Sequence, residues 1–301
     1  MRIADALTAA RAMGVARLDA QWLLEHLLGR PRSWLLAHDD TELTTAQAAD
    51  LQAGLARRAA GEPLAYVVGE REFRGLTLQV TPAVLVPRPE TELLVDWALE
   101  HLPPGAALDV VDLGTGSGAI ALALQHERPQ ARVLASDASA EALAIAQGNA
   151  KRLGLAVAFV QGDWWAPLPG RRYALAVSNP PYVAGDDPHL AALTHEPRIA
   201  LTPEGDGLTA IRRIVAGAPA HLLPGAWLLL EHGHDQADAV QQLLRDAGFE
   251  AVQTRNDLAG LPRCTGARLP GEKWCHSAAP HTDGYRGLPH TGGCTPRHAG
   301  A

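Results

Sequence analysis

The chain has 301 residues, of which 47% are apolar and 20% are charged, and its net charge is −7 at neutral pH. This composition supports a substantial core and, at this length, about two domains of ordinary size. The negative charge argues against general binding to nucleic acids or to acidic membrane surfaces. We therefore expect no direct nucleic-acid partner.

The sequence shows no targeting or membrane feature. Met1–Asp5 reaches an acidic residue at once and has no apolar signal-peptide segment. No apolar run approaches the roughly 18 residues that a membrane helix needs. Cys264, Cys275 and Cys294 contain no C-x-x-C pair, which is typical of a reducing compartment. We expect a soluble, cytoplasmic protein without membrane contact.

Residues 1–62 are predicted to form a small helical domain. Apolar residues such as Leu51, Leu55 and Ala59 recur there at helical spacing, and glycines and prolines divide the segment into about four helices. The segment carries no catalytic motif, so we assign it to packing or to substrate docking.

Residues 63–90 are predicted to form a β-hairpin linker. The expected strands are 66–68, 76–80 and 84–86. The segment Pro87–Glu92 follows, in which the prolines end the last strand and Glu90 or Thr91 starts the next helix. A loop this stiff and charged is compatible with a plain connector or with the border of a site.

Residues 91–270 are predicted to form an α/β domain with a Rossmann-like sheet, because strand and helix patterns alternate from residue 108 onward. The expected strands are 108–113, 132–136, 156–160, 173–178, 226–231 and 249–254. The expected helices are 117–127, 139–152, 207–222 and 235–247. A final segment, 261–269, is expected to add an antiparallel edge strand beside 249–254.

Residues 271–301 are rich in Gly, Pro and His and lack a periodic apolar face. We expect a disordered tail. The spacing of its histidines and cysteines matches no standard zinc pattern, so we expect no metal site.

A glycine loop, Gly114-Thr115-Gly116-Ser117-Gly118, joins the strand 108–113 to the following helix. Such a turn lets the backbone approach a ligand and directs helix N–H groups toward it. Asp137 lies about 20 residues further on, where a carboxylate can accept hydrogen bonds from two ribose hydroxyls. The pattern predicts a nucleoside cofactor and leaves open whether this is a nicotinamide dinucleotide or S-adenosylmethionine.

Asp163-Trp164-Trp165 follows the strand 156–160, at the sheet edge where ligands bind. An acid and an aromatic face suit an adenine ring. We expect one of the two tryptophans to contact adenine and the other to pack in the core.

The most specific feature is the turn Asn179-Pro180-Pro181-Tyr182 after the strand 173–178. The two prolines fix φ and remove two backbone donors. The Asn179 side-chain oxygen and the Pro180 carbonyl then form a pocket of acceptors that grips an NH2 group by both hydrogens, and Tyr182 offers a flat face to a planar group. This arrangement suits an amide or exocyclic amine that attacks a methyl donor, because it stabilises the positive charge that develops on nitrogen.

Together, Asp112–Gly118, Asp137, Asp163-Trp164 and Asn179–Tyr182 resemble the class I S-adenosylmethionine-dependent methyltransferases. More narrowly, the chain resembles the protein-(glutamine-N5) methyltransferases of peptide chain release factors. Further residues carry this narrower resemblance, namely Pro87–Glu92, Glu196–Leu201, Gly205–Leu208 and Asp257–Gly260. The related enzymes that modify a ribosomal protein glutamine typically differ in Pro87–Glu92.

The resemblance implies that Gly114–Gly118, Asp137, Trp164 and Asn179 bind the methyl donor, S-adenosylmethionine. It also implies that Asn179, Pro180, Pro181 and Tyr182 hold the glutamine of the Gly-Gly-Gln motif of a release factor. Asn179, Pro180 and Tyr182 are then the catalytic residues, and the N-terminal helical domain helps to dock the release factor.

Three other functions are compatible with parts of the sequence. An adenine-N6 methyltransferase of DNA or RNA would use the same turn, but the chain lacks a basic stripe. A nicotinamide-dependent oxidoreductase would use the glycine loop, but it has no use for a pocket of acceptors at Asn179. A catalytically silent binding module is disfavoured by the intact Asn179.

Overall fold

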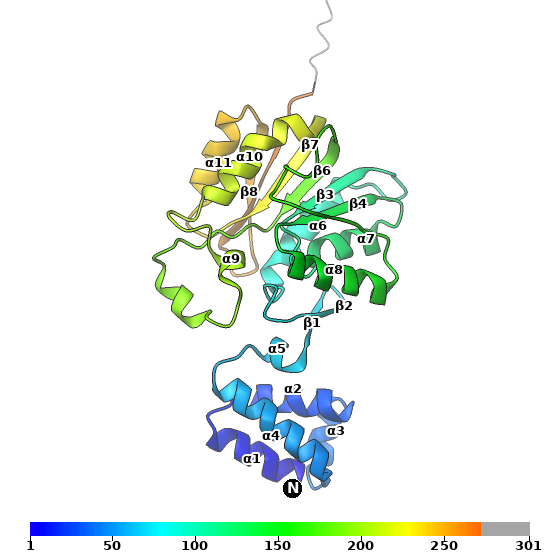
Figure 1. Ribbon diagram of the computed structural model, residues 1–301, viewed down its shortest axis with the longest axis vertical. Coiled ribbons are helices and arrows are strands. Elements are labelled where there is room, and N and C mark those ends of the chain that lie inside the picture. Colours follow the sequence, from blue (N-terminus) through cyan, green and yellow to red (C-terminus); the bar gives the residue numbers. More distant parts are fainter. Residues whose placement is uncertain (272–301) are drawn as a thin grey trace, which may run out of the picture. The chain divides into compact units, whose positions relative to one another are not determined.

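The computed structural model describes residues 1–271, and the ribbon in Figure 1 shows a helical N-terminal part, a β-hairpin and a larger part built on a sheet. Except for Gly271, the predicted tail lies outside the described residues. Within residues 1–271, no helix combines the length and the apolar character needed to cross a membrane.

The N-terminal part is built from helices with a small core of their own. The helices are α1 (Ile3–Ala12), α2 (Arg17–Leu28), α3 (Arg32–Ala37) and α4 (Thr45–Ala59). A capping box starts α4, in which Thr44 and Gln47 exchange hydrogen bonds of 3.0 and 3.2 Å. Leu24, Leu35 and Leu55 are buried between the helices. These helices confirm the helical character predicted for this segment.

The predicted strand at 66–68 is wrong, because these residues lie in the short helix α5 (Leu64–Val68). The carbonyl of Pro63 accepts the first helical hydrogen bonds, and Gly69, with φ of +86°, ends the helix in the left-handed conformation. The helical turn buries Tyr66, whose hydroxyl donates to the carbonyl of Val84 at 2.5 Å. Tertiary packing therefore overrides the β-propensity of this segment.

The linker contains a genuine hairpin, in which β1 (Glu70–Phe73) pairs antiparallel with β2 (Leu76–Gln79). The predicted strand at 84–86 is not formed. The backbone N–H of Val86 instead donates to the buried carboxylate of Glu196 at 3.1 Å, so a side chain takes the place of a neighbouring strand.

Among the described residues, the main sheet has seven strands in the order β5-β4-β3-β6-β7-β9-β8. The strands are β3 (Asp109–Leu113), β4 (Arg132–Asp137), β5 (Ala158–Gln161), β6 (Tyr173–Ser178), β7 (Leu222–Glu231), β8 (Glu250–Asn256) and β9 (Pro262–Arg268). Strands β3 to β7 pair in parallel, and β9 pairs antiparallel with both β7 and β8. The predicted Rossmann-like α/β fold is confirmed.

The antiparallel pairing of the last two strands is also confirmed, but the predicted edge position of the last strand is wrong. Strand β9 lies between β7 and β8, and β8 forms the edge. The burial of each strand accounts for this order, since Thr265 and Ala267 in β9 are fully buried, whereas most residues of β8 are partly or fully exposed.

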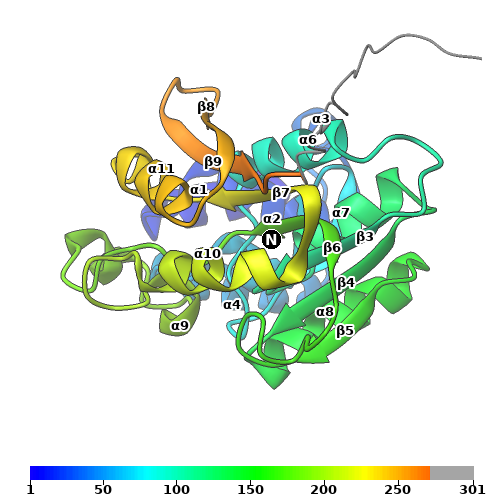
Figure 2. The same ribbon diagram turned by 90° about the horizontal axis from the view of Figure 1, so that it is seen from above.

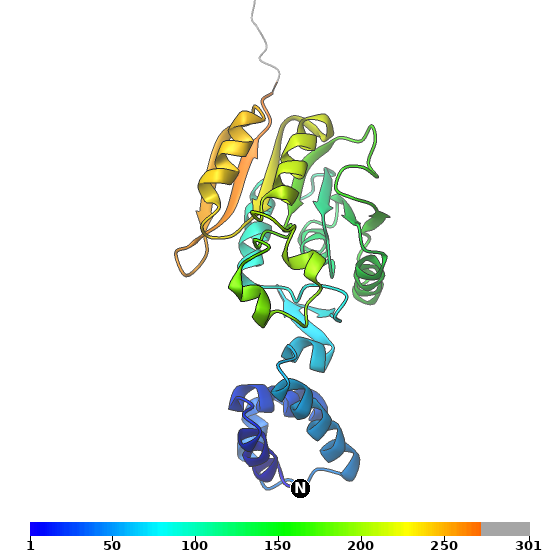
Figure 3. The ribbon, with the colours of Figure 1, turned by 60° about the vertical axis from the view of Figure 1, so that its left-hand side comes forward.

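Helices cover both faces of the main sheet (Figures 2 and 3). One face packs against α6 (Glu92–Glu100), α7 (Ala119–Glu127) and α8 (Ala140–Leu153), and the other against α10 (Thr209–His221) and α11 (Ala237–Asp246). The remaining helical segments are η1 (Pro89–Thr91), η2 (Pro188–Ala192) and α9 (Arg198–Leu201).

Gly266 in β9 allows close packing between the main sheet and α6. A Cβ atom at this position would lie 2.5 Å from Leu229 Cδ2 and 2.7 Å from Trp97 Cη2. We predict that Gly266→Ala lowers the free energy of unfolding by about 1–3 kcal/mol, because the added methyl group overpacks the core. Urea denaturation followed by circular dichroism measures this change.

The matched control is Gly148→Ala in α8, where a Cβ atom would meet nothing within 4 Å. We expect that variant to be neutral or to be stabilised by about 0.5–1 kcal/mol, because alanine favours a helix. A Gly266→Ala protein as stable as the wild type would contradict the packing described for β9.

Candidate active site

The site lies where the strand order reverses, between β3 and β6. In an open α/β sheet, ligands bind beyond the carboxyl ends of the strands at such a point. A cavity of about 460 Å³ opens there, a volume typical of small-molecule sites. The predicted site residues that line it are Gly114, Thr115, Gly116, Ser117, Asp137, Trp164, Asn179 and Pro181. The structure thus brings the glycine loop and the asparagine turn to one cavity.

The glycine loop needs glycine at its tightest points. Gly114 and Gly116 have φ of +74° and +56°, a region that side-chain-bearing residues rarely adopt. Gly118 precedes α7 and does not line the cavity, but a Cβ atom there would lie 2.9 Å from Leu122 Cδ1. Its role is the close packing of the helix start.

Asp137 ends β4 and faces the loop. One carboxylate oxygen accepts from the N–H of Gly116 and the other from the N–H of Ser139, both at 2.9 Å. Burial raises the pKa of Asp137, and these backbone hydrogen bonds oppose the rise. Each oxygen keeps a further lone pair with which it can accept a ligand hydroxyl.

Beneath the loop, Asp112 is fully buried in β3. Its Oδ2 accepts from the Thr115 hydroxyl at 2.6 Å, which ties the loop to the strand. Its Oδ1 is buried and has no hydrogen-bond partner within residues 1–271. Burial raises the pKa of Asp112 to about 7, with the Thr115 hydroxyl acting in the opposite direction.

The two tryptophans separate as expected, in that Trp164 lines the cavity and Trp165 lies in the core. Trp164 has φ of +50°, and its ring packs on the loop, 3.1 Å from where Gly114 would carry a Cβ atom. Trp165 donates from Nε1 to the carbonyl of Ile214 at 2.8 Å. Asp163 also lines the cavity, but its carboxylate is paired with Arg213.

Asn179 follows β6 at the opposite wall of the cavity. The preceding hydroxyl, that of Ser178, donates to the carbonyl of Leu113 at 2.6 Å and so ties this turn to the base of the glycine loop. The Asn179 amide nitrogen donates to the Thr91 hydroxyl at 3.1 Å. The amide oxygen is therefore left free to face a ligand.

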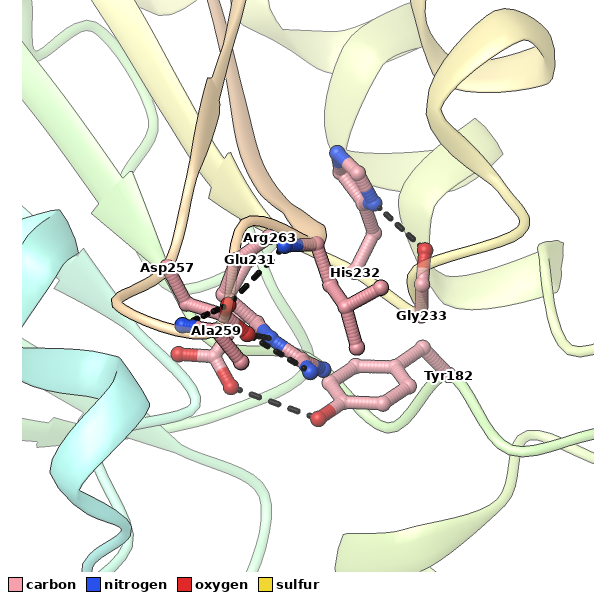
Figure 4. A network of polar contacts seen from close by, with 8 residues as sticks. Tyr182, Glu231, His232, Gly233, Asp257, Ala259 and Arg263 are labelled. Atoms are coloured by element: carbon pink, nitrogen blue, oxygen red, sulfur yellow. Dashed lines mark hydrogen bonds and ion pairs between the residues drawn. The ribbon is translucent and has the colours of Figure 1, made fainter.

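Pro180 and Tyr182 were expected in the pocket, but they are not among the residues that line the cavity. Pro180 is buried. The Tyr182 hydroxyl donates to Oε1 of Glu231 at 3.3 Å, and Figure 4 shows it pointing into a polar network with Arg263 and Asp257. Burial raises the pKa of Glu231 to about 7.

Several supporting residues escaped the sequence analysis because their partners are distant in the chain. The buried Asn149 donates to the carbonyls of Ser117 and Gln79 at 2.9 and 3.0 Å, which joins the glycine loop to the hairpin. Arg88, at the cavity, pairs with the buried Glu196. The segment Pro87–Glu92 therefore borders the site, which settles the choice between a plain connector and a site border.

Comparisons with known proteins agree with this architecture. The chain matches the family models "PrmC N-terminal domain" over residues 2–69 and "Methyltransferase small domain" over residues 90–220. It is 54% identical to the release factor glutamine methyltransferase of Bordetella pertussis, over 85% of this chain and 96% of that protein. It is 43% identical to the Escherichia coli protein of the same name, over 87% of this chain and 95% of that protein. A crystal structure of a methyltransferase from Pyrococcus furiosus shares the fold, with 18% sequence identity and a TM-score of 0.50. The match covers 76% of this chain and 100% of that chain.

The sheet order, the cavity and the matching family models define a class I methyltransferase. The high identity over nearly the whole length of its curated relatives then decides the family: the chain belongs to the release factor glutamine methyltransferases. Membership in this family sets aside the oxidoreductase and the silent binding module.

The buried Asp112 generates a prediction about stability and pH. Because its folded pKa of about 7 exceeds its unfolded value of about 3.9, the native state binds more protons between these values. Stability therefore falls as the pH rises through this interval. We predict that Asp112→Asn makes the fall less steep between about pH 5 and 7, by up to about 1.4 kcal/mol per pH unit.

Urea denaturation at a series of pH values measures this slope. Asp50→Asn, at an exposed position in α4, is the control and should leave the slope as in the wild type. A pH profile of Asp112→Asn identical to that of the wild type would mean that Asp112 does not carry the assigned proton.

Proposed function

We propose that this chain transfers a methyl group from S-adenosylmethionine to the side-chain amide nitrogen of the glutamine in the Gly-Gly-Gln motif of peptide chain release factors. The observation that carries the proposal is that the glycine loop and Asn179 line the same cavity. The curated relatives, which bear the name of this activity, support it. We propose the cytoplasm as the place of the reaction, in keeping with such a substrate.

The residues along one side of the cavity fit a nucleoside-bearing methyl donor. The glycine loop would approach it with backbone atoms, Asp137 would accept from its ribose hydroxyls, and Trp164 would pack against its adenine ring. When bound, S-adenosylmethionine supplies an electrophilic methyl group on a sulfonium. The chain's contribution is to orient that group toward the substrate nitrogen held at Asn179. Transfer breaks the bond between methyl and sulfur, which leaves S-adenosylhomocysteine as product, and the nitrogen gives up one of its two protons to solvent.

The acceptor side must hold a weak nucleophile. The lone pair of a carboxamide nitrogen is delocalised, so attack requires a nitrogen that carries growing positive charge. Asn179 has its oxygen available because its amide nitrogen is engaged by Thr91. We assign the carbonyl of Pro180, which is flanked by the lining residues Asn179 and Pro181, as the second acceptor. Two fixed acceptors stabilise the charge that develops on nitrogen and orient it for attack.

The helical segment 1–62 is assigned to docking of the release factor. It has its own core and a family model of its own, which matches residues 2–69. The linker joins it to the cavity rim, since Arg88 in the linker lines the cavity and pairs with Glu196. A protein substrate held by the helical segment would thus reach the rim beside Asn179.

The test is to incubate the purified chain with S-adenosylmethionine and a release factor, and to locate the added methyl group by mass spectrometry. We expect the methyl group on the Gly-Gly-Gln glutamine and none on DNA or RNA offered in parallel. Methylation of nucleic acid alone would identify the chain as an adenine methyltransferase and refute the proposal.

Asn179→Ala should lower kcat by about 10²–10³-fold, because one of the two acceptors that stabilise the developing charge is removed. Circular dichroism checks that the fold remains, and measuring kcat at saturating S-adenosylmethionine separates this loss from any weakening of donor binding. Methylation at a near-normal rate would remove Asn179 from the role assigned to it.

Asp137→Ala should weaken binding of S-adenosylmethionine by about tenfold or more, because each hydrogen bond to a charged group contributes about 1.5–3 kcal/mol. Titration calorimetry measures the affinity. The matched control is Asp109→Ala. Asp109 begins the neighbouring strand β3, at the end away from the cavity, and forms an exposed ion pair with Arg132. Equal affinities of the two variants would count against the ribose contact.

A further inference from the structure

The direction of the Asn179 amide decides whether the cavity offers an acceptor or a donor. An amide has an oxygen at one end and an NH2 group at the other, and only the oxygen can accept the hydrogens of an incoming carboxamide. In the structure the NH2 group of Asn179 is turned toward Thr91 Oγ1, at 3.1 Å. Some feature of the protein must hold the amide in this direction.

Thr91 is well placed to do so, because its hydroxyl is not used elsewhere in its helix. Thr91 lies at the end of η1 and at the N-terminus of α6, a position where a threonine side chain commonly caps the helix. Here it makes no capping hydrogen bond. Its side chain is instead buried and is directed to Asn179 across 88 positions of sequence.

A hydroxyl alone does not fix the amide, since it can donate or accept. If the Thr91 proton pointed at Asn179, the amide would turn and present its NH2 group to the cavity. The amide direction is therefore set by whichever acceptor takes the Thr91 proton.

The candidate for that acceptor is Glu231, the last residue of β7, which the pairing of Ser178 with Leu230 brings next to Asn179 at the end of the sheet. Glu231 is 1% exposed, and its Oε2 is buried and has no hydrogen-bond partner among the described residues. Burial raises the pKa of this carboxyl, and the Thr91 hydroxyl acts in the opposite direction. Above pH 7, where this carboxyl is mostly ionised, it can only accept. A Thr91 proton directed to its unpartnered Oε2 would leave the threonine oxygen to accept from the Asn179 amide.

The surroundings of Glu231 hold it in place from several elements (Figure 4). Tyr182 donates to its other oxygen at 3.3 Å. Arg263 in β9 faces it with positive charge and is itself paired with Asp257 at 3.2 Å, while Glu90 in η1 opposes its ionisation. The Tyr182 hydroxyl thus contacts Glu231, and Tyr182 is not among the residues that line the cavity.

We infer that Thr91 and Glu231 are positioning residues, which hold the Asn179 amide with its oxygen toward the cavity and so make the turn an acceptor for a substrate NH2 group. The Asn179 amide nitrogen donates to the Thr91 hydroxyl, and we assign the Thr91 proton to the buried, unpartnered Oε2 of Glu231. This inference rests on the proposed function for its kinetic consequence, but the contact between Thr91 and Asn179 exists without any substrate.

The first experiment compares Thr91→Val, which keeps the shape and removes the hydroxyl, with Thr91→Ser, which keeps the hydroxyl. For Thr91→Val we expect kcat for release factor methylation to fall about tenfold to a hundredfold, because a misdirected acceptor no longer orients the nucleophile. The affinity for S-adenosylmethionine should stay as in the wild type. Thr91→Ser should recover most of kcat, which a purely structural role of the threonine methyl group would not allow.

A second set of variants tests whether Thr91 and Glu231 act through Asn179. Thr91→Val combined with Asn179→Ala should be no slower than Asn179→Ala alone, since residues that act as a unit are not additive. Glu231→Gln, which offers a donor as well as an acceptor, should lower kcat about fivefold by allowing both amide directions. Glu250→Gln, in an exposed ion pair of β8, is its matched control.

A substrate-free measurement separates this inference from the proposed function. The side-chain amide signals of Asn179 are identified in the NMR spectrum of the full chain by their loss in Asn179→Ala. Their chemical shifts should change in Thr91→Val and return toward the wild-type values in Thr91→Ser. If the wild type failed to methylate a release factor, the proposed function would fall and this measurement would still decide the inference.

Three results would overturn the inference. The first is a wild-type kcat in Thr91→Val, and the second is an equal loss of kcat in Thr91→Val and Thr91→Ser. The third is that the chemical shifts of the Asn179 amide are the same with and without a hydroxyl at position 91. A loss of stability in Thr91→Val is read from its melting temperature, and Thr91→Ala then replaces it in the same comparison.

Discussion

The site depends on the parallel pairing of β3 with β6. In this register Val111 lies opposite Ala176 and Asp112 opposite Val177, so the two strands end side by side. The Ser178 hydroxyl then joins the two ends through the carbonyl of Leu113. Because both connections leave the sheet at the same edge, the glycine loop and the asparagine turn face each other across one cavity. A shift of this register would separate the two halves of the site.

Each half of the site is supported from below by a buried carboxyl group. Asp112 lies under the glycine loop and takes a hydrogen bond from the Thr115 hydroxyl, and Glu231 lies beside the asparagine turn and takes one from Tyr182. Both carboxyls are buried and both have a pKa raised to about 7 by burial. Burying a carboxyl group lowers stability unless hydrogen bonds compensate. The two buried carboxyl groups thus lower the stability of the fold, but their hydrogen bonds hold the short loops of the site in one conformation.

The sequence predicted the features that are local in the chain. The glycine loop, Asp137 and Asn179 stand directly after apolar runs, so strand periodicity and motif together place them at the carboxyl edge of the sheet, where the structure has them. Features that depend on distant partners were missed or misplaced. Asn149 joins Gln79 across 70 positions, and Glu196 binds Val86 across 110.

The same limit explains the three structural errors, namely the strands expected at 66–68 and 84–86 and the edge position expected for 261–269. Residues 66–68 have strand-forming side chains, but they become helical because this turns Tyr66 toward Val84. Periodicity predicts a strand at 261–269, but it does not say which neighbours that strand has. The burial of Cys264–Ala267 in the middle of β9 follows from contacts with β7 and α6 that are not encoded in the pattern of its own residues.

The place of β9 between β7 and β8 has a consequence for the order of folding. Strand β7 emerges from the ribosome before β9, so during synthesis its free side is an unpaired edge until residues 262–268 are available. Such an edge is open to pairing with another chain. A nascent or prematurely ended chain that stops before Pro262 would keep this edge exposed and would be prone to aggregate, even though the whole candidate active site precedes that point in the sequence.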